Sequence, residues 1–87
     1  MLGPKSTLKL HFGGEQVAAA RKLLRITQEE LAAATGLTRV TIAKFEAGGN
    51  MRPETVEAVR EALLARGIVF TNGGEPGVKL RKTESEN

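Results

Sequence analysis

Residues 36–48, GLTRVTIAKFEAG, hold the side chains whose types and spacing could recognise another molecule. At about 100° per residue, a helix over this stretch places Thr38, Ile42 and Phe45 on one side. The opposite side carries Val40, Ala43, Lys44 and Ala47, and Arg39 flanks it, so this side combines cations with small apolar groups. An ordinary surface helix would carry Glu and Lys there. This side is therefore predicted to contact a partner through hydrogen-bond donors and apolar groups.

The chain offers no comparable set of residues for catalysis or metal binding. It contains no cysteine, which excludes disulfides, thiolate metal sites and a cysteine nucleophile. His11 is the single histidine, and no second ligand or base lies within sequence reach of it. The adjacent acids Glu29 and Glu30 are explained by helix capping, and NGGEPG at 72–77 lacks the lysine of a phosphate loop. We therefore predict that the chain is not an enzyme and binds no cofactor, metal or small-molecule ligand.

The composition is that of one small folded domain. The chain has 87 residues, of which 40% are hydrophobic, and this fraction supplies a core. The net charge of +3 is mildly basic and does not by itself imply nucleic acid. No apolar run approaches the roughly 20 residues of a membrane span, and no signal-peptide pattern opens the chain. We therefore expect a cytoplasmic protein with no membrane partner.

Helical periodicity and capping residues predict four helices, over 15–25, 28–35, 39–47 and 53–66. The motif TQEE is a capping box, in which Thr27 caps the backbone and Glu30 reaches back to the Thr27 amide. Thr38 caps the third helix, and Pro53 suits the first turn of the fourth. Gly36 supplies the turn conformation between the second and third helices.

Two other segments show the period of two that is typical of β-strands. Residues 7–12, TLKLHF, alternate Leu and Phe with Lys and His, which predicts a strand. Near the C-terminus, the runs IVF and VKLR flank a Gly-rich connector and predict a β-hairpin, with Val78 and Leu80 on one side. A two-stranded hairpin alone is marginal in water, so we expect a small sheet built from 7–12, 68–71 and 78–81. Its edge could pair with a second copy, or the hairpin could cap the fourth helix.

The second and third predicted helices, joined by GLT, form a tight helix-turn-helix. Together with RP at 52–53, the segment TQEELAAATGLTRVTIAKFEAG closely resembles the Cro/XRE family of bacterial and phage repressors. The residues that match the family pattern are Gln28, Glu30, Leu31, Ala32, Gly36, Ile42, Glu46 and Gly48. The resemblance covers about residues 15–66.

The elements and the resemblance together predict a mainly α fold with a small β appendage. The resemblance implies a lambda repressor-like helix-turn-helix bundle of four helices, followed here by a C-terminal β-hairpin that an N-terminal strand can join. The expected divisions are an N-terminal arm or strand at 1–14, an XRE-type helix-turn-helix domain at 15–66, a β-hairpin at 67–82 and a disordered tail at 83–87.

The resemblance also implies a sequence-specific regulator of transcription that inserts helix 39–47 into the major groove of double-stranded DNA. The base-reading positions of the family fall on Arg39, Val40 and Lys44. Arg39 could make a bidentate contact to guanine, and Val40 could pack against a thymine methyl. The side chains expected to hold phosphates are Gln28, Thr38, Thr41, Asn50 and Arg52. The family commonly carries a structural salt bridge, whose positions here are Arg21 and Glu46.

Family relatives bind as dimers to half-sites about one helical turn apart, so we expect a homodimeric repressor on an approximate palindrome in the bacterial cytoplasm. Single-stranded nucleic acid is less favoured, because the chain has three Phe and no Tyr or Trp for base stacking. The alternative is a protein-binding module, such as an antitoxin or an antagonist of another regulator, that uses the hairpin surface. The outer face of helix 39–47 carries no acidic residue, which favours DNA.

Overall fold

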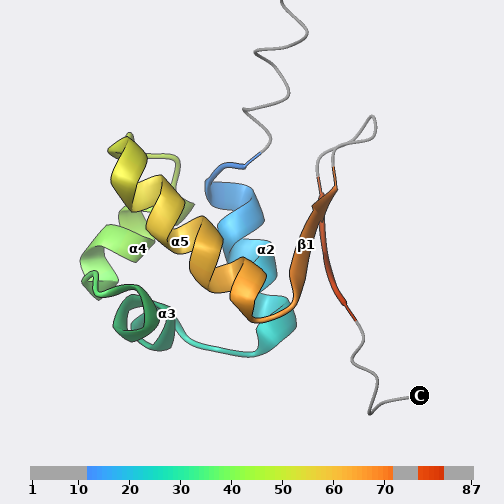
Figure 1. Ribbon diagram of the computed structural model, residues 1–87. Helices are drawn as coiled ribbons and strands as arrows, with labels where there is room; N and C mark the ends of the chain where they lie inside the picture. Colours follow the sequence, from blue (N-terminus) through green and yellow to red (C-terminus); the bar gives the residue numbers. More distant parts are fainter. Residues whose placement is uncertain (1–11, 72–76, 82–87) are drawn as a thin grey trace, which may run out of the picture.

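The computed structural model describes residues 12–71 and 77–81, which form four helices followed by two strands (Figure 1). The elements are α2 (Gly14–Leu24), α3 (Gln28–Thr35), α4 (Arg39–Glu46), α5 (Pro53–Ala65), β1 (Ile68–Thr71) and β2 (Gly77–Leu80). This order confirms the predicted mainly helical fold with a C-terminal hairpin. The strand predicted over 7–12, apart from Phe12, and the tail predicted over 83–87 lie outside the described residues.

The starts of α3 and α4 follow from capping residues that lie next to them in the sequence. Thr27 Oγ1 accepts a hydrogen bond from the Glu30 backbone N at 3.0 Å, and the Glu30 carboxylate accepts one from the Thr27 N at 2.7 Å. Thr38 Oγ1 accepts one from the Thr41 N at 3.1 Å. These bonds satisfy N–H groups that have no partner within a helix, and both helices start where the sequence predicts.

The turn between α3 and α4 is short because Gly36 adopts the left-handed conformation, with a φ of 76°. The Leu37 N–H then donates to the Ala32 carbonyl at 3.0 Å, and the Thr35 hydroxyl donates to the Leu31 carbonyl at 2.9 Å. These bonds close the last turn of α3 and direct the chain into α4. The two helices therefore form the predicted helix-turn-helix.

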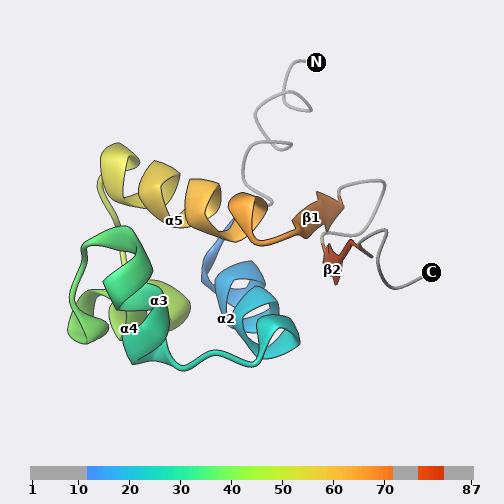
Figure 2. The ribbon, with the colours of Figure 1, turned by 60° about the horizontal axis from the view of Figure 1, so that its bottom comes forward.

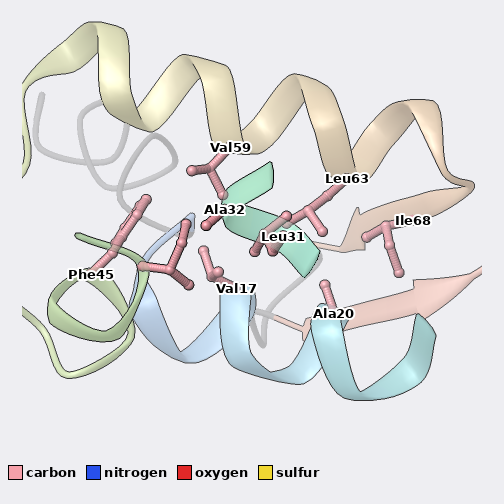
Figure 3. Packing of buried hydrophobic residues seen from close by; sticks show 9 residues of the cluster. Val17, Ala20, Leu31, Ala32, Phe45, Val59, Leu63 and Ile68 are labelled. Carbon is pink, nitrogen blue, oxygen red and sulfur yellow. The ribbon is translucent and has the colours of Figure 1, made fainter. Parts of the chain in front are cut away.

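The hydrophobic core collects side chains from all four helices and from β1, and Figure 3 shows them converging between α5 and α2. Its members are Val17, Ala20, Leu31, Ala32, Ile42, Phe45, Val59, Leu63 and Ile68. Within α4, Ile42 and Phe45 are the buried residues, as the helical period predicts. At the end of α2, Leu24 packs against the core, whereas Leu23 is 42% exposed.

The hairpin covers one end of the helical bundle. β1 and β2 are antiparallel in the register Ile68↔Leu80 and Phe70↔Val78. Directly opposed residues share a sheet face, and on this face Ile68 is buried while Phe70 and Val78 pack against the core. β1 contacts α5 and β2 contacts α2, so the hairpin lies beside α2 at the C-terminal end of α5 (Figure 2). The inner face of the hairpin therefore caps the monomer, and Leu80 at its end is 44% exposed.

Candidate nucleic-acid interface

The outer side of α4 is accessible to a partner. Arg39, Val40 and Lys44 are all exposed, and Val40 is the most exposed large hydrophobic residue of the described ranges, at 64%. On the inner side, Ile42 and Phe45 are 0% and 4% exposed. The first turn of α4 contains no acidic residue. The structure thus presents the three predicted base-reading residues on the outer side of a helix whose inner side is fixed in the core.

The position of α4 is set partly by an ion pair with α2. Arg21 Nε donates to Glu46 Oε2 at 2.8 Å, and Arg21 Nη2 donates to Glu46 Oε1 at 3.1 Å. Arg21 Nη1 donates to the Ile26 carbonyl at 3.1 Å. The Arg21 and Glu46 side chains are only 16% and 9% exposed. Two charge-assisted bonds in a mostly buried place hold the end of α4 against α2.

The environment of Glu46 keeps its carboxylate ionised. Burial is the largest single influence on the pKa of Glu46 and acts to raise it. Hydrogen bonds from Arg21 and Gln28, together with the positive charges of Arg21 and Lys22, act in the other direction and outweigh burial. The pKa of Glu46 is therefore lowered from its ordinary value, and the hydrogen bond to Glu46 raises the pKa of the Arg21 guanidinium.

Gln28, the first residue of α3, joins this ion pair to the outer side of α4. Its Nε2 donates to Glu46 Oε1 at 3.0 Å, and its Oε1 accepts from Arg39 Nη1 at 3.2 Å. The sequence predicts a phosphate contact for Gln28, and one Nε2 hydrogen is left for it. The links to Glu46 and Arg39 are tertiary contacts that the sequence analysis missed. No local signal could have revealed them, because they join three different positions in the fold.

The predicted phosphate contacts at the start of α4 involve a pair of hydroxyl groups. Thr38 Oγ1 accepts from the Thr41 backbone N at 3.1 Å and donates to Thr41 Oγ1 at 3.0 Å. Either hydroxyl can donate in this pair, so one of the two hydroxyl protons is used between Thr38 and Thr41 and the other is left for an external acceptor such as a phosphate.

The remaining phosphate candidates lie beyond the other end of α4. Asn50 and Arg52 are exposed in the segment that leads from α4 to α5. Arg52 occupies the N-cap position of α5 without a side-chain capping bond. The structure therefore places Thr38 and Thr41 at the start of α4, and Asn50 and Arg52 after its end.

Gly14 is a structural residue of this site that the sequence analysis missed. A Cβ atom at Gly14 would collide with the Phe45 carbonyl oxygen and would lie 2.9 Å from the Glu46 carbonyl oxygen. The absence of a side chain therefore lets the start of α2 approach the end of α4 closely. The pair Gly13–Gly14 is visible in the sequence, but it predicts only the end of a strand and does not identify α4 as the neighbour.

Two further observations concern the described ranges, 12–71 and 77–81. None of their helices is both long enough and apolar enough to cross a bilayer. Nor do they bring together three His, Cys, Asp or Glu side chains that could hold a metal ion.

Comparison with known proteins identifies the central part of the chain. A helix-turn-helix family model matches residues 17–64, which is more than half of the chain. The matched range contains all of α3 and α4, and most of α2 and α5. No curated protein matches the chain.

Proposed function

Because the chain belongs to the Cro/C1-type helix-turn-helix family of DNA-binding regulators, we propose that it is a transcriptional repressor that reads operator DNA with α4. The observation that carries the proposal is the exposed outer side of α4, with Arg39, Val40 and Lys44. An α-helix fits the major groove, where donors and apolar groups distinguish base pairs. No acidic residue lies in the first turn of α4 to repel the duplex.

The three exposed side chains of α4 are suited to different base edges. Arg39 uses one N–H on Gln28, and a guanidinium has five, so enough donors are left for guanine O6 and N7. Val40 presents methyl groups that match the methyl group of thymine. Lys44 supplies a second donor side chain one turn after Val40, toward the other end of the reading surface.

Contacts to the DNA backbone are proposed at both ends of α4. One of the paired hydroxyls of Thr38 and Thr41 would donate to a phosphate at the start of the helix. Asn50 and Arg52 would contact phosphates beyond its end. Gln28 could add the free hydrogen of its amide. These contacts carry no sequence information, but they fix the register of α4 in the groove.

We propose further that two copies bind one operator. One helix of eight residues reaches few base pairs, and two-fold dimers on half-sites about one helical turn apart provide useful specificity. The hairpin lies on the opposite side of α2 and α5 from the α3–α4 pair (Figures 1 and 2). Leu23 and Leu80, on elements that contact each other, are 42% and 44% exposed. These features support a dimer through the exposed side chains at the end of α2 and the end of β2, which would separate the two α4 helices.

A selection experiment tests the proposal directly. The full chain is incubated with a pool of random duplexes, and bound DNA is recovered and sequenced over several rounds. We expect one enriched motif with approximate two-fold symmetry and two chains per duplex. The control is a chain with Arg39→Ala and Lys44→Ala, which should enrich no motif. If the wild-type chain enriches no duplex motif, DNA reading is wrong and the protein-binding alternative gains support.

A further inference from the structure

We propose that the Arg21–Glu46 ion pair has a second role beyond holding α2 and α4 together. It orients the amide of Gln28, and the oriented amide holds Arg39 in place for base reading. This inference rests on the proposed function of α4 as the reading helix. In this view Glu46 and Gln28 are positioning residues, which act on DNA recognition through Arg39.

The orientation of Gln28 follows from the polarity of its neighbours. The Glu46 carboxylate is ionised and can only accept hydrogen bonds, so the Gln28 amide must direct its Nε2 toward Glu46. The Gln28 Oε1 then points to the other side, where Arg39 can only donate. A flipped amide would place two acceptors together at Glu46 and two donors together at Arg39. The opposite orientation therefore loses both hydrogen bonds at once.

The ion pair fixes Glu46, the residue from which the hydrogen bonds to Gln28 and then to Arg39 begin. Arg21 binds both carboxylate oxygens of Glu46, at 2.8 and 3.1 Å, and the Glu46 side chain is 9% exposed. A carboxylate held at two points in a mostly buried place has little freedom to turn away from Gln28. The rigid core of the domain is thereby linked to an exposed guanidinium at the start of α4.

This link has a consequence for recognition. A long exposed Arg side chain explores many rotamers and loses that freedom when it binds a base. The Gln28 carbonyl oxygen reduces this cost by holding Arg39 Nη1 at 3.2 Å before DNA arrives. Gln28 therefore contributes to the base preference at the one pair that Arg39 reads.

The test compares base preference in three single variants and one double variant of the full chain. Arg39→Ala defines the base pair that Arg39 reads, where the wild type should prefer its base by about 5- to 150-fold. Gln28→Met has similar length but makes no hydrogen bond, and Gln28→Lys keeps a donor for phosphate but cannot accept from Arg39. Both Gln28 variants should reduce the preference at that pair at least about threefold, with preferences at other pairs unchanged. Gln28→Met combined with Arg39→Ala should match Arg39→Ala alone.

The outcomes separate the inference from the proposed function. If Arg39→Ala changes no base preference, Arg39 is not a reader and both fail. If Arg39→Ala removes a preference that both Gln28 variants keep, the inference alone is wrong. If Gln28→Met loses base preference and Gln28→Lys keeps the wild-type preference, Gln28 acts only through a phosphate contact and the inference is wrong.

In the free protein, NMR relaxation of Arg39 Nε should show that the Arg39 side chain becomes more mobile in the Gln28→Met variant. An unchanged mobility contradicts the inference without any use of DNA.

A variant of Glu46 tests the start of the chain of contacts. Glu46→Gln lets residue 46 donate as well as accept, so Gln28 is no longer held in one orientation. At a temperature where the Glu46→Gln variant is folded, its preference at the base pair that Arg39 reads should fall at least about threefold. Val59→Ala is the control, because Val59 is fully buried in the core and does not belong to this hydrogen-bond chain. Val59→Ala should lower the melting temperature and leave base preference unchanged. Equal preference in wild type and Glu46→Gln would overturn the role of Glu46.

Discussion

The guanidinium of Arg21 and the carboxylate of Glu46 meet through two hydrogen bonds, of 2.8 and 3.1 Å, although 25 positions separate them in the sequence. Replacing Glu46 by Ala would strand the Arg21 charge in a mostly buried place. We expect Glu46→Ala to lower the free energy of unfolding by about 2–4 kcal/mol, measured by urea denaturation. Glu57→Ala is the control, since its contact with Arg60 at 3.5 Å is exposed. Equal small effects of the two variants would contradict a stabilising ion pair.

The same pair predicts a pH dependence. The pKa of Glu46 is lower in the folded chain than the value of about 4.3 expected in the unfolded chain. Its stabilising contribution is therefore present above that unfolded value and is lost as the pH falls through the folded pKa. We expect the stability difference between wild type and Glu46→Gln to be constant near neutral pH and to shrink below about pH 4. A difference that stays constant down to acid unfolding would exclude ionised Glu46 as its source.

Two arginines in the proposed interface should give different DNA-binding phenotypes. Arg39→Ala should weaken binding to the selected duplex by about 1–3 kcal/mol and relax the preference at one base pair. Arg52→Ala should weaken binding to all sequences alike and reduce the slope of log K against log salt by about one. Fluorescence anisotropy titrations at several salt concentrations measure both effects. Unchanged affinity and preference after Arg39→Ala and after Lys44→Ala would show that α4 is not the reading helix.

The close approach of α2 to α4 predicts an effect of a single methyl group. Gly14→Ala places a Cβ atom against the Phe45 carbonyl oxygen, so we expect a loss of about 1–3 kcal/mol in the free energy of unfolding. Gly13→Ala is a matched control, because a Cβ atom there lies 3.5 Å from its nearest neighbour, the Gln16 side chain. Thermal denaturation compares the two variants. If Gly14→Ala is as stable as Gly13→Ala, the two helices do not approach as closely as described.

The proposed dimer can be tested on the exposed side chains of the hairpin. Leu80→Glu places a charge on the proposed apolar contact, and we expect a folded monomer in sedimentation experiments, because Leu80 is 44% exposed in the single chain. Lys79→Glu, on the other face of β2, should retain the wild-type mass. A folded Leu80→Glu chain with the wild-type dimer mass would remove Leu80 from the proposed interface.

The helices of this protein could be predicted because their signals are local. Thr27, Thr38 and Pro53 act on backbone groups within one turn, and Gly36 acts through its own φ angle. None of these effects requires knowledge of the rest of the fold. The observed bounds accordingly differ little from the predicted ones. α2 begins and ends one residue earlier, at Gly14 and Leu24, and α4 and α5 each end one residue earlier, at Glu46 and Ala65.

The outward direction of Arg39, Val40 and Lys44 was also determined by the sequence, since the helical period that buries Ile42 and Phe45 leaves those three positions outside. The contacts around Arg39 were not determined by the sequence alone. The chain of contacts from Arg21 through Glu46 and Gln28 to Arg39 joins α2, α3 and α4, and it exists only when those helices pack in this arrangement. The approach of Gly14 to Phe45 and the hairpin lying over α2 and α5 depend on the same packing. Such contacts arise from the summed burial of the whole core, so no local pattern specifies them, and only the tertiary structure decided them.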